Sequence, residues 1–354
     1  MFYPVIFKPI YKEMIWGGDR LNRVFERTLP SGKIGESWDI SCRPAEMGII
    51  ENGSWAGKSF AEYIEENRTG VLGTRLADTE RFPLLVKLID ANDSLSIQVH
   101  PDDIFARQKG SADSGKSEMW YVLVPPDDGH LIIGLNSGVT REVLAQAYEN
   151  GTVEQCLYRL PVKTGDIINI PAGLVHALTS GVMVAEVQQN SDLTYRLYDY
   201  NRLGLDGQPR PLHVDDALTV TDFSGKIPKN AVSGLNIKKD GNELIYAICN
   251  PYFAIIKYVL SDSLNENSDP AAFSIFTCVE GKAVIEMPTL TAELLTGRSV
   301  FIPAGMGAYN IKPADDNGAV LLKSFVPDIT KDFFDPLYAA GFSREDIQAH
   351  TALS

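Results

Sequence analysis

The stretch GDIINIPAGLVHA at residues 165–177 guides the interpretation of the whole chain, because it aligns without gaps with GRSVFIPAGMGAY at residues 297–309. Both copies share the pattern Gly-x5-Pro-x-Gly. An apolar, β-branched run, a turn centred on Pro-Ala-Gly and a second apolar run are typical of two strands joined by a tight turn. We therefore expect the chain to contain two copies of one β unit.

The composition is that of a globular protein with a sizeable core. The chain has 354 residues, of which 44% are hydrophobic and 22% charged. That length suits two domains of about 150 residues each. The formal net charge is −14, which would on average repel a phosphate backbone. We therefore expect no nucleic-acid partner.

The sequence shows neither the pattern of a signal peptide in its first residues nor a long apolar run typical of a membrane-spanning helix. The start, MFYPVIFKPI, has no basic segment followed by a continuous apolar one, and the longest uncharged run, 167–185, is interrupted by the Pro-Ala-Gly turn. We expect no membrane partner. The cysteines form no Cys-x-x-Cys pair, which favours a reducing, cytoplasmic location. They are Cys42, Cys156, Cys249 and Cys278.

Short β-branched and aromatic runs bounded by Gly, Pro, Asn and Asp predict a mainly β protein. Clear examples are residues 81–89, 94–99, 119–124 and 166–170. Helical patterns are confined to a few peripheral segments, at 59–67, 140–150 and the tail from 328, including 343–350. The segment SGKIPKNAVSGLNIKKDG at 224–241 loses the apolar alternation. We therefore predict a domain boundary near 225, with domains 1–225 and 226–354.

Polar residues alternate with aliphatic ones in SLSIQVHPDD at 94–103. On a strand, this spacing places Ser96, Gln98 and His100 on one face. In GKSEMWYVL at 115–123, the same spacing places Lys116 and Glu118 on one face. These residues offer metal ligands if both faces line a barrel interior.

The turn of the first copy adds a third ligand candidate, His176, which is replaced by Ala308 in the second copy. Two imidazoles, a carboxylate and an amide oxygen suit a divalent metal with one position left for water or substrate. Taken alone, each histidine could be a hydrogen-bonded structural residue and Glu118 a salt-bridged carboxylate. Their coincidence favours a metal site in the first copy only.

The segment AEVQQNSDLTYRLYDYNR at 185–202 brings further charged residues towards the same site. Glu186, Arg196 and Arg202 follow His176 closely in sequence. Arginine pairs well with phosphate or with an oxygen that gains negative charge, so these cations favour an anionic small molecule. The alternative is that both arginines form ion pairs with acidic residues of the same segment, Asp192, Asp199 or Glu186.

Together these motifs resemble a known family, the type I mannose-6-phosphate isomerases of the cupin superfamily in their compact bacterial form. The resemblance covers most of the chain and rests on FKPIYKEMIWGG (7–18), IGESWDIS (34–41), SLSIQVHPDD, KSEMWYVL, PAGLVHAL (171–178) and TYRLYDYNR (194–202). It implies a bicupin, that is, two cupin-type jelly-roll β-barrels with a few short helices. The second barrel is then a degenerate copy without metal ligands.

The resemblance also implies roles for individual residues. The zinc ligands are expected to be Gln98, His100, Glu118 and His176, with one Zn²⁺ per chain. Arg196 matches the active-site arginine of the family and Glu186 a site carboxylate. Ser96 and Lys116 match positions associated with the substrate and its phosphate, and Arg202 lies where a basic residue is expected near that phosphate.

The implied activity is the interconversion of D-mannose 6-phosphate and D-fructose 6-phosphate through an enediol-type intermediate, with Glu186 as our hypothesis for the base. The expected protein is a cytoplasmic monomer or homodimer that binds a phosphosugar. Rival interpretations are an iron-dependent cupin dioxygenase, a phosphoglucose-type isomerase and a sugar-binding bicupin without activity. Gln98 and the gathered lysine and arginine residues favour a redox-inert phosphosugar site.

Overall fold

The computed structural model describes residues 2–288 and 290–353. The chain forms two compact units: unit 1 comprises Met1–Ile10, Trp38–Lys87 and Val232–Ser354, and unit 2 comprises Tyr11–Ser37 and Leu88–Ala231. A division of the chain at residue 225 does not describe these units, because two N-terminal segments belong with the C-terminal part. The reason is strand pairing: β1 (Val5–Lys8) pairs with both β4 (Ile49–Ile50) and β21 (Ser299–Ile302).

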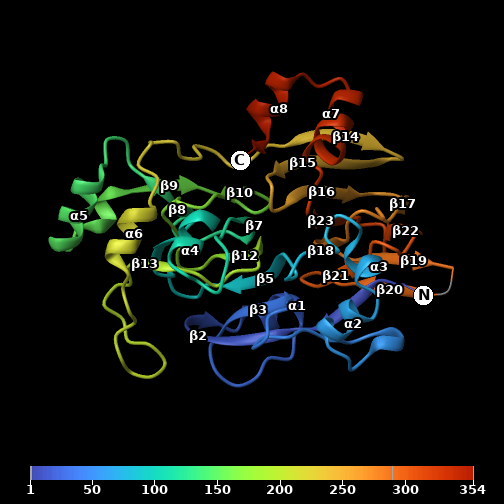
Figure 1. Ribbon diagram of the computed structural model, residues 1–354, viewed down its shortest axis with the longest axis horizontal. Helices are drawn as coiled ribbons and strands as arrows, with labels where there is room; N and C mark the ends of the chain where they lie inside the picture. Colours follow the sequence, from blue (N-terminus) through green and yellow to red (C-terminus); the bar gives the residue numbers. More distant parts are fainter. Residues whose placement is uncertain (1, 289, 354) are drawn as a thin grey trace. The chain divides into compact units, whose positions relative to one another are not determined.

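Unit 1 contains a nine-stranded and a four-stranded sheet. The first has the order β14-β15-β16-β23-β18-β21-β1-β4, with β24 paired to β15, and the second has the order β17-β22-β19-β20 (Figure 1). The remaining strands are β14 Leu235–Lys239, β15 Asn242–Cys249, β16 Ala254–Leu260, β17 Leu264–Asn267, β18 Ser274–Gly281, β19 Ala283–Met287, β20 Leu290–Leu294, β22 Ala308–Pro313, β23 Ala319–Phe325 and β24 Ala352–Leu353.

Unit 2 carries most of a six-stranded sheet and all of a five-stranded one. Their orders are β10-β7-β12-β5-β3-β2 and β13-β6-β11-β8-β9. The strands are β2 Ile10–Gly18, β3 Ile34–Ile40, β5 Leu84–Asp90, β6 Ile97–Val99, β7 Glu118–Val124, β8 His130–Leu135, β9 Leu157–Pro161, β10 Ile167–Ile170, β11 His176–Ala177, β12 Met183–Gln189 and β13 Tyr195–Tyr198.

The helices are short, and strands and loops make up most of the chain (Figure 1). They are α1 Arg20–Phe25, η1 Gly53–Trp55, α2 Phe60–Glu66, α3 Arg68–Leu72, α4 Asp103–Gln108, α5 Arg141–Glu149, η2 Val153–Cys156, α6 Val214–Val220, the π-helical turn η3 Ile329–Phe334, α7 Asp335–Ala339 and α8 Arg344–His350. None of the helices in the described residues has the length and apolar character needed to cross a membrane.

The mainly β prediction is confirmed, and so are the predicted helices. Ser59 caps α2, where its hydroxyl accepts the amide hydrogen of Glu62 and the Glu62 carboxylate accepts that of Ser59. Thr140 caps α5 and Ser343 caps α8 in the predicted segments. The helices α1, α3, α4 and α6 were not predicted, because they span only five to seven residues and, unlike the equally short α2 and α8, do not begin with a capping box.

Strand pairing confirms the internal repeat. In the first copy β10 pairs with β7, which pairs with β12; in the second copy β21 pairs with β18, which pairs with β23. The register is the same, since Ile170 lies opposite Glu118 and the aligned Ile302 lies opposite Ser274. Residues of the two copies can therefore be compared strand by strand.

The turn of the first copy is tied to the end of strand β6. The Gly173 amide donates to the carbonyl oxygen of His100 at 2.8 Å. Gly173 adopts a φ of +86°, and a Cβ added there would lie 3.1 Å from the Val220 carbonyl oxygen. Glycine is therefore required both by the left-handed backbone and by the close approach. This turn fixes where His176 begins β11.

We predict that Gly173→Ala destabilises the protein more than Gly129→Ala. Both glycines have positive φ, but a Cβ at Gly129 would meet nothing within 4 Å. The left-handed conformation costs each variant about 1–2 kcal/mol, and only Gly173→Ala also forces a neighbour to move. Thermal unfolding measures the difference. Equal melting temperatures for the two variants would show that the close approach to Val220 is unimportant.

Candidate metal centre and active site

Three strands of unit 2 deliver the candidate ligands. Strands β6 and β11 run antiparallel with Gln98 directly opposite His176, and Glu118 is the first residue of β7. The strand predicted over 94–99 is shorter than expected and covers Ile97–Val99. Ser96 and His100 thus flank β6, and both are buried.

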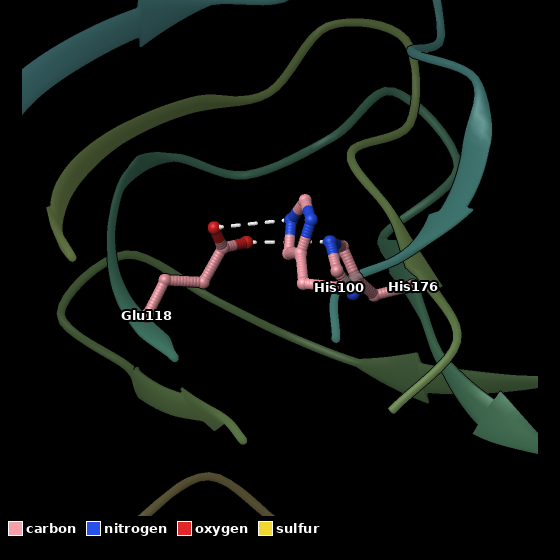
Figure 2. Close-up of side chains that lie close together, drawn as sticks. All are labelled: His100, Glu118 and His176. Atoms are coloured by element: carbon pink, nitrogen blue, oxygen red, sulfur yellow. Dashed lines mark ion pairs between the residues drawn. The ribbon is translucent and has the colours of Figure 1, made fainter. Parts of the chain in front are cut away.

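His100, Glu118 and His176 form a buried cluster. His100 Nε2 lies 3.4 Å from Glu118 Oε2, and His176 Nε2 lies 3.3 Å from Glu118 Oε1 (Figure 2). One ligand atom from each residue lies within 4.8 Å of the others. All three side chains are at most 1% exposed, so water does not solvate them in this arrangement.

Backbone carbonyls fix the tautomers of both histidines. His100 Nδ1 lies 2.9 Å from the Leu193 carbonyl oxygen, and His176 Nδ1 lies 2.8 Å from that of Leu174. Since a carbonyl oxygen only accepts, Nδ1 must carry the proton in each ring. Each neutral ring therefore directs the lone pair of Nε2 towards the Glu118 carboxylate. This is the orientation that metal-binding histidines need.

The surroundings favour the protonation states in which His100, His176 and Glu118 can bind a metal ion, namely neutral imidazoles and an ionised carboxylate. Burial lowers the pKa of His100 to about 3, and the Lys116 ammonium acts in the same direction. Burial likewise lowers the pKa of His176. Burial, the largest single influence, acts to raise the pKa of Glu118, but Lys116, His100 and His176 together outweigh it and hold that pKa well below its ordinary value. The cluster thus combines neutral imidazoles with an ionised carboxylate.

These residues fit a divalent cation. His100 Nε2 and Glu118 Oε2 are buried and have no hydrogen-bond partner among the described residues. Two nitrogen lone pairs face the Glu118 carboxylate without a proton between them. The Lys116 ammonium, 3.1 Å from Glu118 Oε2, offsets part of the negative charge, and a divalent cation between the three side chains would satisfy the remaining acceptors. Two nitrogen ligands and one or two oxygen ligands match the donor set of catalytic zinc sites.

Gln98 lies at the edge of this cluster and is held by Ser96. The Ser96 hydroxyl donates to Gln98 Oε1 at 3.2 Å, and Gln98 Nε2 lies 3.4 Å from His176 Nε2. A half-turn of the amide exchanges its oxygen and nitrogen without changing its shape, and the Ser96 hydroxyl can accept as well as donate. Gln98 can therefore present its oxygen to a cation at the place where its NH₂ group now meets His176.

Lys116 contacts the cluster directly. Its Nζ lies 3.1 Å from Glu118 Oε2, and its side chain is 6% exposed. The ammonium is therefore within reach of any anionic group bound next to Glu118. The structure thus brings Ser96, Gln98, His100, Lys116, Glu118 and His176 into one group, while their roles stay predictions.

Glu186 shares a sheet face with Glu118. On strand β12, Glu186 lies opposite Trp120 and Gln188 lies opposite Glu118, so these side chains point to the same side. The Trp120 indole donates to Glu186 Oε1 at 3.1 Å, and its ring packs edge-on against His176 with centroids 5.4 Å apart. Sequence analysis missed Trp120, although the alternation that selected Lys116 and Glu118 continues to it.

Arg196 lies on the other sheet, in line with the ligands. On β13, Arg196 is opposite Gln98, which is itself opposite His176 on β11, so the three side chains share one face. His213 holds this strand: its amide donates to the Arg196 carbonyl oxygen at 2.8 Å, and its Nδ1 accepts the Arg196 amide at 3.2 Å. Within the described residues, Arg196 Nε is buried without a hydrogen-bond partner.

Arg202 forms an ion pair with Asp199, which was one of the two alternatives that the sequence analysis allowed. Its guanidinium lies 2.6 Å from Asp199 Oδ1 and packs 5.0 Å from the centroid of the Tyr200 ring. Arg210, which sequence analysis did not select, shares Asp199 at 3.4 Å. Burial lowers the pKa of Arg210, and the positive charges of Arg196 and Arg202 add to this. Arg202 and Arg210 therefore share the Asp199 carboxylate, and the charge of Arg196 is felt at Arg210.

Known proteins resemble the chain over most of its length. The family model for phosphomannose isomerase type I, catalytic domain, matches residues 5–122, and that for mannose-6-phosphate isomerase, cupin domain, matches residues 242–314. The probable mannose-6-phosphate isomerase GmuF of Bacillus subtilis is 36% identical over 314 residues, 88% of this chain and 97% of the relative. The chain belongs to the type I mannose-6-phosphate isomerases. It is an isomerase, as predicted.

Other relatives and solved structures of the family agree. The mannose-6-phosphate isomerase of Streptococcus mutans is 33% identical over 303 residues, 86% of this chain and 93% of the relative. The crystal structure of the mannose 6-phosphate isomerase from Bacillus subtilis superimposes with a TM-score of 0.82 at 32% identity, covering 91% of this chain and 99% of that one. The expected fold class, mainly β with cupin domains, is thereby confirmed.

We predict that the purified isomerase holds about one zinc ion per chain and that His100→Ala abolishes this binding, because it removes one of only three or four ligands. His130→Ala is the matched control: His130 Nδ1 bonds to the Asp128 carbonyl oxygen at 2.6 Å, and His130 is not a member of the cluster. Elemental analysis after gel filtration measures the metal. Full metal content in His100→Ala would contradict the assignment.

We also predict that His100 in the chelated, metal-free protein does not take up a proton near pH 6.5, the ordinary pKa of histidine. The folded state keeps this ring neutral, whereas the unfolded chain protonates it. The contribution to stability is therefore full above pH 6.5 and is lost as the pH falls towards 3. Imidazole NMR resonances followed from pH 8 to 5 test this, and a His100 midpoint near 6.5 would contradict it.

Proposed function

We propose that this isomerase interconverts D-mannose 6-phosphate and D-fructose 6-phosphate by moving a proton between C1 and C2 of the open-chain sugar. The supporting observation is the common face shared by Glu118 and Glu186 and by Gln98, His176 and Arg196. These strands bring candidate metal ligands, a carboxylate and a guanidinium to one part of unit 2. The names of the relatives supply the substrate.

The metal-holding residues are Gln98, His100, Glu118 and His176, and we propose zinc as the ion. When bound, a divalent metal supplies Lewis-acid stabilisation of negative charge on the sugar oxygens. The chain's own residues keep the ligand set neutral apart from Glu118. They also exclude water, since both histidines and Glu118 are buried.

Glu186 is our candidate base. Its carboxylate is buried on strand β12 and oriented by the Trp120 indole, which holds Oε1. A carboxylate in this position can take the proton from C2 of the aldose and return it to C1. Arg196 is the candidate for supporting the charge that develops on O1 and O2 during this transfer.

The remaining predicted residues position the substrate. Lys116 is close enough to Glu118 to exchange that ion pair for a contact with the substrate. Ser96 orients the Gln98 amide and presents its hydroxyl next to it. Arg202 contributes positive charge together with Arg210 around Asp199, and we assign these arginines to the phosphate end of the sugar.

We further propose a cytoplasmic location, supported by four cysteines that are all free thiols in the structure. A reducing compartment keeps such thiols from forming disulfides.

A coupled assay tests the proposed function. Fructose 6-phosphate formed from mannose 6-phosphate is measured before chelation, after chelation and after zinc is restored. The proposal requires turnover that disappears on chelation and returns with the metal. A folded, metal-loaded protein without this turnover would refute the substrate assignment.

We predict that Glu186→Gln lowers kcat by about 10²- to 10⁴-fold with little change in KM or metal content, because the amide keeps the shape but cannot accept the proton. Glu142→Gln, on the solvent-facing first turn of α5, is the control and should be unchanged. Near-normal kcat in Glu186→Gln would remove Glu186 from the role of base.

A further inference from the structure

Unit 1 contains a cavity that the isomerase reaction does not use. Its volume is about 430 Å³, which lies within the range of ligand-binding pockets. Strands of both sheets of unit 1 line it, including β15, β16 and β23 on one side and β17 on the other. The cavity therefore lies inside the second copy of the β unit.

The common strand register of the two copies shows which residues of the second copy stand at the positions of the candidate metal site. In the first copy Glu186 lies opposite Trp120, and in the second copy Lys323 lies opposite Phe276. Lys323 thus occupies the strand position of the candidate base, and Ser274 occupies that of the ligand Glu118. Both Lys323 and Ser274 line the cavity. The second copy therefore has the ammonium group of Lys323 where the first copy has the carboxylate of Glu186.

Lys323 is a largely buried cation with loose pairing. Its side chain is 18% exposed, and its Nζ lies 3.6 Å from Glu266 Oε2 and 3.4 Å from the Tyr258 hydroxyl. Glu266 is already held by Lys239, whose Nζ lies 2.8 Å from Glu266 Oε1. Two ammonium groups therefore share one carboxylate. The Lys323 Nζ also lies 5.7–5.8 Å from the ring centroids of Tyr258, Phe276 and Phe325, so ring faces and one shared carboxylate supply its partners and no carboxylate is dedicated to it.

The acidic residues at the other side of the cavity are paired independently. Asp332 Oδ2 lies 3.0 Å from Arg75 Nη1, and Asp269 Oδ2 lies 3.8 Å from Arg75 Nη2 and 3.9 Å from Lys331 Nζ. These carboxylates are thus neutralised by cations other than Lys323. The positive charge of Lys323 inside the cavity is therefore not cancelled from this side.

The rest of the lining combines ring faces with hydroxyl and amide groups. Tyr246, Tyr258 and Phe325 supply aromatic surface, and Asn267 and Ser274 supply hydrogen-bonding groups. The Tyr258 hydroxyl lies 3.4 Å from Lys323 Nζ, next to the proposed position of an anionic group. Such a lining suits a molecule that carries both C–H surface and several hydroxyls.

We propose that this cavity is a binding site for a small polyhydroxylated monoanion of the sugar-acid class, with its acidic group on Lys323. A single ammonium matches one negative charge, the aromatic rings pack against the carbon chain, and the hydroxyls bond to the polar lining. The site is separate from the isomerase chemistry and does not depend on the proposed function.

Isothermal titration of the full, metal-loaded chain with gluconate and with sorbitol tests the proposal, because the two polyols differ in the carboxylate. Gluconate should bind at least about tenfold more tightly than sorbitol, the effect of one charge-assisted contact. Lys323→Met should lose this preference. Lys312→Met is the matched control, since Lys312 forms an exposed pair with Glu286 at 2.8 Å.

A second variant guards against misfolding of Lys323→Met. Ala272→Leu adds volume to the lining without changing charge and should also abolish gluconate binding. Gluconate binding that survives both substitutions would overturn the proposal, as would equal affinity for gluconate and sorbitol. Binding that survives Lys323→Met and is displaced by mannose 6-phosphate belongs to the isomerase site and also refutes it. Turnover of mannose 6-phosphate, measured on each variant, reports separately on the proposed isomerase function.

Discussion

The rest of the site depends on a set of acceptors that face one another in the protein interior. His100 and His176 direct the lone pairs of Nε2 towards the carboxylate of Glu118. In each ring the proton is on Nδ1, where it bonds to a backbone carbonyl oxygen, so neither ring donates a proton to Glu118. Burial then removes the water that could separate these groups. A cation resolves the conflict, which is why we treat the cluster as a metal site and not as an ordinary hydrogen-bonded group.

The fold explains how distant residues meet at this point. Strand β11 is only two residues long, and its start is set by the turn in which Gly173 bonds to the carbonyl of His100. Strand β7 carries Glu118 and Trp120 on one face, and β12 places Glu186 beside them. Trp120 links the two proposed functions of the site, because its indole donates to the candidate base Glu186 while its ring packs against the candidate ligand His176. Small shifts of these strands would therefore affect metal binding and proton transfer together.

Much of this was predictable from the sequence where side chains alternate. The period of two in residues 94–103 and 115–123 selected Gln98, His100, Lys116 and Glu118, and the aligned turns revealed the repeat and His176. Three features were beyond that reasoning. The compact units depend on the pairing of β1 with β21, which joins residues nearly 300 positions apart. The carbonyls of Leu174 and Leu193 carry no side-chain signal. The ion pair of Arg202 with Asp199 was one of two alternatives, and only coordinates distinguish them.

The two copies of the β unit show how one scaffold separates into different chemistries. The same strand positions carry Glu118 and Glu186 in one copy and Ser274 and Lys323 in the other. The first therefore concentrates negative charge suited to a cation, whereas the second buries a cation of its own. The second copy has Ala308 in place of His176 and Lys323 in place of Glu186, and both replacements contribute to this change.

Anomalous X-ray diffraction at the zinc edge, on crystals of the purified isomerase, tests the central claim most directly. The account predicts one strong peak enclosed by His100 Nε2, His176 Nε2 and the Glu118 carboxylate, within about 2.0–2.2 Å of each ligand atom. A peak at another position, or a zinc-loaded, active protein without density between these three side chains, would contradict it.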